Sequence, residues 1–258
     1  MTSITQRTTP VRTNRGRRAA KKEVFSVSQT ALNKYARIGL WALPIYGLAN
    51  LVGTLSSQPD YHKVANFPAY ARYIHTPSFL ASHLGLSLLG TGIGLLGFTA
   101  LFVYLAIRQF GVSVAAFAST IIGAIFMAAV FGVAAFAQPA IGKAFLAGHH
   151  DVIALNSSVY GTAANLTAAA GTGLFFAGAV LFAIAIARSR TLPRNAGILF
   201  AVSFPIFAIG SITGTALDTI GALGEIAAAI WIARSASRAG SSTAVTSGHE
   251  PALAALEA

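Results

Sequence analysis

Apolar residues in this chain gather in long runs that short polar connections separate. A helix that crosses a membrane needs ~20 mostly apolar residues, and four of the runs meet or approach that length. A content of 55% hydrophobic and 10% charged residues fits the same class of protein. The pattern therefore predicts membrane-spanning helices at residues 38–55, 79–107, 112–137 and 159–187.

The last apolar stretch, residues 196–233, is too long for a single span. One straight helix at ~1.5 Å per residue would be roughly 57 Å long, well beyond a hydrocarbon core of ~30 Å. Two glycines and two hydroxyl residues at 210–214 favour a turn, so we predict two shorter helices. The expected fold is an all-α membrane protein with a six-transmembrane-helix bundle; one long last helix would give five spans.

Lys and Arg residues gather on alternate connections between the runs. With six spans and a cytoplasmic N-terminus, fifteen of the eighteen fall on the cytoplasmic side, and Lys63, Arg72 and Lys143 fall outside. Because cytoplasmic connections collect Lys and Arg, this split supports an even number of spans and two cytoplasmic termini. The fifteen are Arg7, Arg12, Arg15, Arg17, Arg18, Lys21, Lys22, Lys34, Arg37, Arg108, Arg188, Arg190, Arg194, Arg234 and Arg238.

The two ends of the chain are polar and flank a six-helix domain at 37–234. Residues 1–36 form a basic arm that we expect to be disordered and to lie on an anionic lipid surface. Residues 235–258, rich in Ser, Ala and Thr, are expected to form a disordered tail. A net charge of +11 also suits nucleic-acid binding, but the first 22 residues contain no aromatic side chain that could stack on bases, and we expect no nucleic-acid partner.

Small residues and prolines along the spans predict how the helices pack. Gly90, Gly94 and Gly97 follow at i, i+4 and i+7 and make one flat face that favours close contact with a neighbouring helix. Pro44 and Pro205 each predict a kink that adjacent helices can accommodate.

An internal repeat becomes visible when three of the spans are aligned from their cytoplasmic ends. The matches indicate three helical hairpins of the same orientation, although small residues in any inward-going helix would give similar matches without a repeat. The matched sets are Thr91, Thr172 and Asp218; Gly97, Gly178 and Gly224; and Ala106, Ala187 and Ala233.

Glu225 is predicted to lie near mid-membrane, since nine residues separate it from Arg234, or ~13 Å of helix. A charged carboxylate there costs at least ~2.5 kcal/mol, and no cation is predicted at that depth. Asp218 falls on the same helix face, nearer the outer surface. Either the two carboxyls form a path for protons or cations, or Glu225 is a buried acid that fixes the helix register through a hydrogen bond. The candidate partners for that bond are Asn50, Thr91 and Thr172.

Histidines form a second constellation, in the two long outer connections or at their membrane edge. Imidazole and carboxylate suit a divalent metal, and the run His149, His150 and Asp151 is the first candidate; no compact metal signature is present, so solvated histidines remain the alternative. His83 precedes four turns of apolar residues and joins the candidate proton relay. It could bind haem, but the bundle interior offers no second histidine, and we expect no cofactor. The histidines concerned are His62, His75, His83, His149 and His150.

The last helix carries Gly224-Glu225, then five residues, then Trp231 and a basic residue, and the second span ends in Tyr104-Leu105-Ala106. In these features the chain resembles a group of uncharacterised bacterial multi-spanning membrane proteins. The resemblance implies a location in the bacterial cell (inner) membrane and no assigned reaction, and it makes Glu225 a feature of the group.

These features favour a small transporter or proton-coupled permease in which Glu225 accepts and releases a proton and Asp218 lies at the outer entrance. The alternative is a non-catalytic accessory or sensor subunit that packs on another membrane protein, or on a second copy, through glycine-rich faces. An enzyme ranks third, metal-dependent at the outer loops, because no G-x-S-x-G motif and no glycine-rich phosphate loop with its Lys is present. The lipid bilayer is the expected surrounding partner.

Overall fold

The computed structural model describes residues 31–55, 58–60 and 63–254, with side chains as far as residue 239. All regular structure within these ranges is helical, which confirms the all-α prediction. The basic segment 1–30, His62 and the last four residues of the chain, on which parts of the sequence predictions fall, lie outside the described residues.

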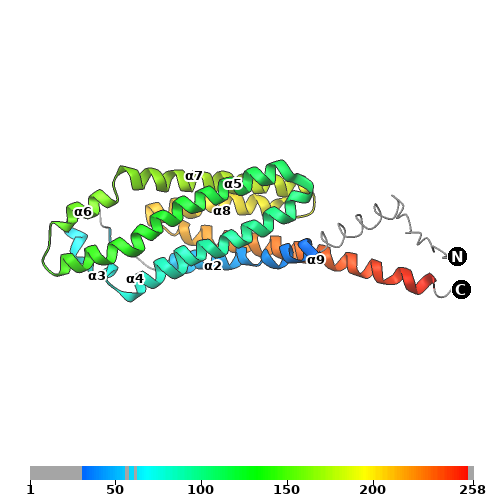
Figure 1. Ribbon diagram of the computed structural model, residues 1–258, viewed down its shortest axis with the longest axis horizontal. Coiled ribbons are helices and arrows are strands. Elements are labelled where there is room, and N and C mark those ends of the chain that lie inside the picture. Colours follow the sequence, from blue (N-terminus) through cyan, green and yellow to red (C-terminus); the bar gives the residue numbers. More distant parts are fainter. Residues whose placement is uncertain (1–30, 56–57, 61–62, 255–258) are drawn as a thin grey trace, which may run out of the picture.

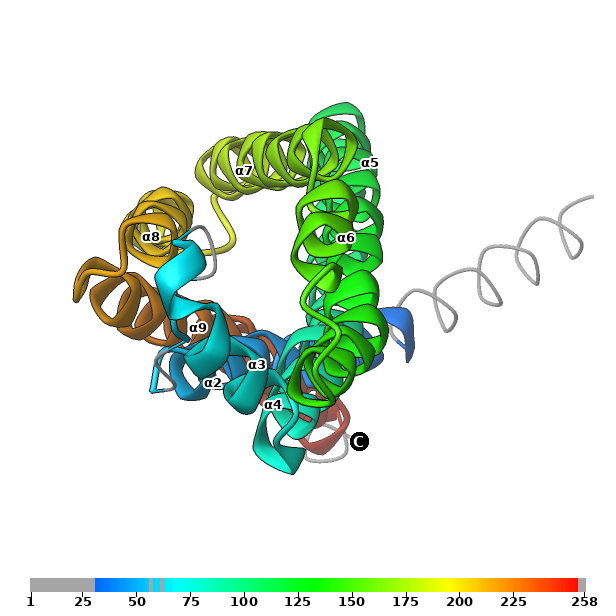
Figure 2. The same cartoon turned by 90° about the vertical axis from the view of Figure 1, so that its left-hand side faces the viewer.

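The helices run along the long axis of an elongated bundle, with the short helices α3, α4 and α6 at one end (Figure 1). Seen down that axis, α2, α5, α7, α8 and α9 are arranged around the centre of the bundle (Figure 2). The elements are α2 (Ala42–Gly53), the 3₁₀ helix η1 (Val64–Asn66), α3 (Phe67–Ile74), α4 (Pro77–Ala81), the π-helix η2 (Ser82–Leu89), α5 (Gly90–Leu146), α6 (Val152–Val159), α7 (Thr162–Ser189), α8 (Arg194–Thr213) and α9 (Leu217–Ala254).

Three helical stretches are long and apolar enough to cross a membrane, namely Pro77–Leu146, Val152–Ser189 and Arg194–Thr213. These stretches support a membrane protein. Helix α2 falls short of the length because it has 12 residues, and the apolar part of α9 is diluted by Asp218 and Glu225.

Helix α5 is a hairpin of two arms, residues 90–108 and 110–146. At Gln109 the backbone leaves the helical region, with φ −137° and ψ 53°. The rings of Phe102 and Phe117, on either side of that residue, stack with centroids 4.7 Å apart and planes 9° from parallel. The predicted connection between the spans 79–107 and 112–137 is therefore confirmed as a reversal at Gln109.

The first apolar run is interrupted ahead of Pro44. Residues 31–39 are helical, the chain turns at 40–41, and α2 begins at Ala42. Proline has no N–H to donate to the carbonyl four residues earlier and its ring crowds that carbonyl, so the predicted kink is confirmed as a break. Ala36 is buried in the core. Residues 31–36, which the sequence prediction assigns to the disordered arm, are therefore helical, and residues 1–30 lie outside the described residues.

Helices α8 and α9 are separated where the sequence predicts a turn. Gly214 takes a left-handed conformation, φ +63°, and ends α8 after Thr213, which is the usual role of glycine at a helix C-terminus. Helix α9 then continues to Ala254. The sequence predicts a disordered tail from residue 235, whereas the described residues there are helical and Ala236 is fully buried against the core.

The predicted glycine face of the first α5 arm packs on α2. A Cβ atom added at Gly90, Gly94 or Gly97 would come within about 3.1 Å of α2 atoms, so only glycine lets the two helices approach this closely. The α2 residues they meet are Ala49, Tyr46 and Leu43 respectively.

Glycines at matched positions make the same kind of contact in each helical pair. Gly97 meets Leu43 on α2, Gly178 meets Thr120 on the second α5 arm, and Gly224 meets Ser203 on α8. In every case the glycine of the later helix contacts the helix before it. The aligned glycines of the sequence therefore occupy equivalent places in three antiparallel pairs.

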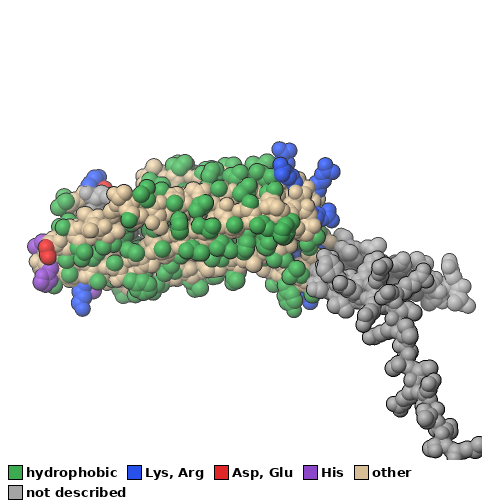
Figure 3. All heavy atoms as spheres, turned by 45° about the horizontal axis from the view of Figure 1, so that its top comes forward, with side chains coloured by type: hydrophobic (Ala, Val, Ile, Leu, Met, Phe, Trp, Pro, Cys, Tyr) green, Lys and Arg blue, Asp and Glu red, His purple; other side chains and the backbone are tan. Residues whose placement is uncertain are grey.

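Charged side chains are concentrated at the two ends of the bundle, with apolar side chains between them (Figure 3). Gln109 Nε2 donates to the Arg188 carbonyl at 3.4 Å, which places the α5 turn beside the end of α7. We call the end that carries Arg108, Arg188, Arg190 and Arg194 the arginine end. The opposite end, with His149, His150 and Asp151, is the histidine end.

Candidate functional site

The buried face of α9 is set by two neighbouring residues, Gly224 and Glu225, which face different helices. Gly224 lies against Ser203 of α8, so close that a Cβ atom would collide with the serine hydroxyl. Glu225 points to the other side, toward α2, and only 2% of its surface is exposed. The glycine therefore brings α8 close to the helix that carries the carboxyl.

The Glu225 carboxyl has one hydrogen-bond donor within the described chain. Asn50 Nδ2 donates to Glu225 Oε2 at 2.8 Å, while Oε1 is buried and has no hydrogen-bond partner. Of the three partners considered from the sequence, Thr91 donates to the Ser87 carbonyl and Thr172 to the Met127 sulfur. The structure thus brings Asn50 to Glu225 and leaves the two threonines on other partners.

Tyr46 joins the site from one helical turn before Asn50. Its ring lies among Phe98, Phe175 and Phe204, with centroids 6.1, 6.2 and 6.5 Å away. Its hydroxyl group lies near the Asn50 side chain and the Glu225 carboxyl. No sequence prediction included Tyr46; the signal was the spacing of four from Tyr46 to Asn50 on α2 and on to Thr54, which follows that helix.

A second group of polar contacts lies one helical turn beyond Asn50, toward the histidine end. Thr54 Oγ1 and Thr219 Oγ1 are 3.2 Å apart and link α2 to α9. Thr219 also donates from its backbone N–H and its hydroxyl to Asp218 Oδ1, and Asp218 is partly exposed. Asp218 therefore lies at the open end of the site, seven residues or ~10 Å along the helix from Glu225. We call Tyr46, Asn50, Thr54, Thr219, Glu225 and Asp218 the polar seam.

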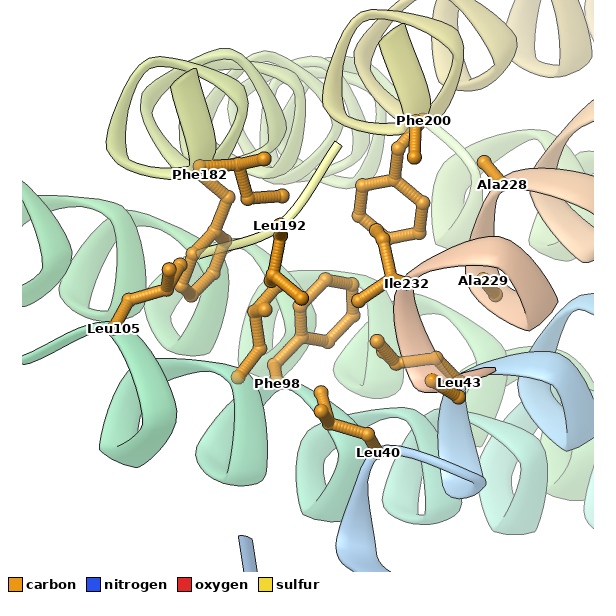
Figure 4. Close-up of a cluster of buried hydrophobic side chains, with 14 of the residues drawn as sticks. Leu40, Leu43, Phe98, Leu105, Phe182, Leu192, Phe200, Ala228, Ala229 and Ile232 are labelled. Carbon is orange, nitrogen blue, oxygen red and sulfur yellow. The ribbon is translucent and has the colours of Figure 1, made fainter. Parts of the chain in front are cut away.

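Beyond Glu225, toward the arginine end, the same helices meet through apolar side chains alone. Leu40 and Leu43 face Ala229 and Ile232 of α9, with Phe98 from α5 closing the layer (Figure 4). Each of these side chains is at most 1% exposed. The polar seam therefore begins at the partly exposed Asp218 and stops at Glu225, against a hydrophobic layer.

No ion pair in the described part of the chain involves Glu225; the recorded pair, Lys63 and Asp60 at 3.5 Å, is near the histidine end. An isolated carboxylate inside a helix bundle is costly, so the neutral acid is the form favoured by these surroundings. Oε1 is the atom at which a proton can reside while Oε2 accepts from Asn50.

His83 lies on the π-helix η2, away from these contacts. Its Nδ1 is 3.0 Å from the Phe79 carbonyl, and its ring packs on the Phe79 ring with centroids 4.0 Å apart. Its recorded partners belong to its own helical turn, so the structure gives no contact that would make His83 part of a relay with Glu225.

The predicted metal site at His149, His150 and Asp151 is not formed. All three residues are exposed in and beside the turn between α5 and α6, and the His150 ring packs edge-on against Phe145, with centroids 4.8 Å apart. Within the described ranges, no three side chains of His, Cys, Asp or Glu come close enough to hold a metal ion.

Comparisons with protein-family models, with curated proteins and with solved structures give no match to this chain. The polar seam and the helix arrangement are therefore the basis on which a function is inferred.

Proposed function

We propose that this chain crosses a bacterial cell (inner) membrane six times, with both termini in the cytoplasm. The first segment would be residues 31–53, and the second would be α4, η2 and the first arm of α5. The other four would be the second arm of α5, α7, α8 and the first half of α9. The arginine end would be cytoplasmic, which agrees with the tendency of cytoplasmic connections to collect Lys and Arg. The resemblance to bacterial multi-spanning proteins supports the same location.

We also propose that the six segments are three repeated hairpins. The matched glycines Gly97, Gly178 and Gly224 support this, because each contacts the preceding helix of its own pair. Under this proposal Glu225 and Asp218 belong to the third hairpin, and Asn50 and Thr54 belong to the first. The polar seam would then lie between the first and last repeats, where relative movement of hairpins would open or close it.

For activity, we propose a small proton-coupled transporter in which Glu225 accepts and releases the coupling proton. The main observation that supports this proposal is the buried Glu225 carboxyl. Asn50 donates to one of its oxygens, and the other oxygen has no hydrogen-bond partner. Ionisable residues within a membrane bundle commonly mark proton or ion paths. The seam supplies hydroxyl groups from Asp218 as far as Glu225, and the apolar layer beyond it closes the arginine side.

The chemistry couples proton loss to a rearrangement. As a neutral acid, Glu225 fits its apolar surroundings with one hydrogen bond from Asn50. Loss of the proton leaves a carboxylate with a single donor, which is unfavourable in this packed site. Release is therefore favoured when α9 separates from α2 enough to hydrate the carboxylate, and that separation would expose the seam to the opposite side.

Proton movement in proteoliposomes tests this proposal. Purified protein is reconstituted with a pH-sensitive dye inside, and a potassium diffusion potential drives proton entry. Glu225→Gln keeps the shape and an acceptor for Asn50 but cannot exchange a proton, so entry should fall to the rate of protein-free vesicles. Thr172→Val, a change at a threonine that bonds Met127 instead of the seam, is the matched control and should keep the native rate.

A second candidate is a non-catalytic accessory or sensor subunit. The observation that favours it is the filled interior around Tyr46, where three phenylalanine rings pack. A shallow depression of the described surface is lined by Ala129, Val130 and Tyr160 and does not include Glu225. For this candidate, Glu225→Gln leaves proton entry unchanged from the native protein and instead reduces recovery of a membrane partner in affinity purification.

A further inference from the structure

The arginine end carries a ring of cations that no described side chain neutralises. The acidic side chains placed by the structure are Asp60, Asp151, Asp218 and Glu225, and the ion pair found among the described residues, between Lys63 and Asp60, does not involve this end. On the face that Figure 3 shows, this end carries basic side chains and no acidic ones. All of the basic residues are exposed except Arg37, which is partly buried. They are Lys34, Arg37, Arg108, Arg188, Arg190, Arg194, Arg234 and Arg238.

Arg37 adds a specific need for an anion at this end. Its Nε atom is buried and has no hydrogen-bond partner. A buried N–H without an acceptor is unfavourable, because the donor has lost its hydrogen bond to water. Arg37 is one of several basic residues at this end, and their like charges favour the binding of an anion.

Arg190 occupies a backbone position that suits glycine. Its φ of 55° is the one positive value at a non-glycine residue within the described ranges, and such a conformation is unfavourable for a residue with a Cβ atom. The buried Ser189 fixes the turn, with its Oγ 2.9 Å from Thr191 Oγ1 and accepting from the Thr191 N–H. Arg190 thus presents an exposed charge at a position where glycine would be unstrained.

Exposed aromatic and aliphatic side chains lie next to these cations. Tyr35, Phe110 and Trp231 are 70%, 68% and 43% exposed, and each is within three residues of a basic residue in the sequence. Aromatic rings beside Lys and Arg are typical of the boundary between hydrocarbon and headgroups. Acyl chains can cover the rings while phosphates meet the guanidinium groups.

We propose that the arginine end binds the phosphate headgroups of anionic phospholipids, with Arg188, Arg190 and Arg194 around the α7–α8 connection as the principal contacts. Guanidinium groups bind phosphate through paired hydrogen bonds, and three of them lie within seven residues of sequence. The exposed aromatic side chains beside them favour a lipid over a soluble polyanion. This site is separate from Glu225 and does not depend on the proposed transport activity.

Lipid retention in nanodiscs tests the proposal. Full-length protein is placed in nanodiscs of equal parts phosphatidylglycerol and phosphatidylcholine, extracted into mild detergent, and the retained lipids are counted by native mass spectrometry. The native protein should retain phosphatidylglycerol preferentially. Joint substitution of Arg188→Gln, Arg190→Gly and Arg194→Gln should reduce that preference at least tenfold, since each basic residue near a membrane surface is worth about fivefold in lipid affinity.

A matched variant removes three cations from the histidine end, with Lys63→Gln, Arg72→Gln and Lys143→Gln. It should retain the native lipid preference, and an equal loss in the two triple variants would overturn the assignment to the arginine end. Equal retention of both lipids by the native protein would overturn it as well.

Single substitutions at Arg190 separate an effect on lipid binding from an effect on folding. Arg190→Gly should preserve or raise the melting temperature, because glycine fits the left-handed backbone, and should still weaken phosphatidylglycerol retention several-fold. Arg190→Lys should restore most of the retention. Unchanged retention in Arg190→Gly would remove Arg190 from the site.

Discussion

Asn50 donates a hydrogen bond of 2.8 Å to Glu225 Oε2 and so joins two residues 175 positions apart in the chain. The bond ties the first apolar run to the last one, at the end of the polar seam. Its donor is an amide, which can hold the carboxyl in the neutral or the charged state. Asn50 therefore fixes where the acid lies without fixing whether it carries a proton.

Replacing Asn50 alone should destabilise the protein more than replacing Asn50 and Glu225 together. Asn50→Leu takes away the donor recorded for Glu225 and should cost about 1–3 kcal/mol of folding stability, the usual penalty for a buried polar group left without a partner. Asn50→Leu combined with Glu225→Leu should recover much of that loss. Thermal unfolding in detergent measures both effects. If the double variant loses as much stability as Asn50→Leu and Glu225→Leu lose in sum, the two residues are not coupled.

The seam also predicts a pH-dependent chemical reaction. Dicyclohexylcarbodiimide reaches carboxyl groups through the lipid phase and modifies the protonated form, so labelling of Glu225 should be strong at low pH and decline as the pH rises. Mass spectrometry of peptides locates the label. Asp218, which is partly exposed, is the internal control and should be labelled far less, because the reagent reaches carboxyl groups from the lipid phase. Equal labelling of Asp218 and Glu225 would contradict a neutral acid at residue 225.

Much of the helix arrangement could be predicted because it depends on local patterns. The break at 210–214 follows from Gly214, whose left-handed backbone ends α8, and the face of Gly90, Gly94 and Gly97 follows from their spacing. Glu225 stood out because a lone acid in an apolar run has few structural explanations. Each of these signals lies within one helix.

Features that depend on contacts between distant segments were less accessible. Tyr46 was missed because a tyrosine within an apolar run does not stand out from the other aromatic side chains of a span. Its contribution to the polar seam comes from its hydroxyl group. The short helices α3 and α6 lie in segments expected to be outer loops. They are stabilised by packing, as Phe67 of α3 does against Phe145 of α5 with centroids 5.0 Å apart, and no pattern within either segment reveals that contact.

Two glycines, Gly221 and Gly173, differ in how closely a neighbouring helix packs against them. Gly221 lies against the backbone of Phe207, with no room for a Cβ atom, whereas a Cβ atom at Gly173 would meet nothing within 4 Å. Gly221→Ala should therefore separate α8 from α9 and destabilise the protein by about 1–3 kcal/mol. Gly173→Ala should be neutral or stabilising by up to about 1 kcal/mol, since alanine favours the helix. Melting temperatures in detergent compare the two, and similar losses would contradict the α8–α9 contact.

Membrane topology can be tested without removing any native thiol, because the chain contains no cysteine. Single cysteines at His149 and Thr215 should react with a membrane-impermeant maleimide added to intact cells, since six spans place both residues outside. Cysteines at Arg190 and Arg238 should react only after the membrane is permeabilised. Thr215 decides between five and six spans, because it lies in the connection between α8 and α9. Protection of Thr215→Cys in intact cells, with labelling of His149→Cys under the same conditions, would favour a single long last span and put Glu225 at a different depth.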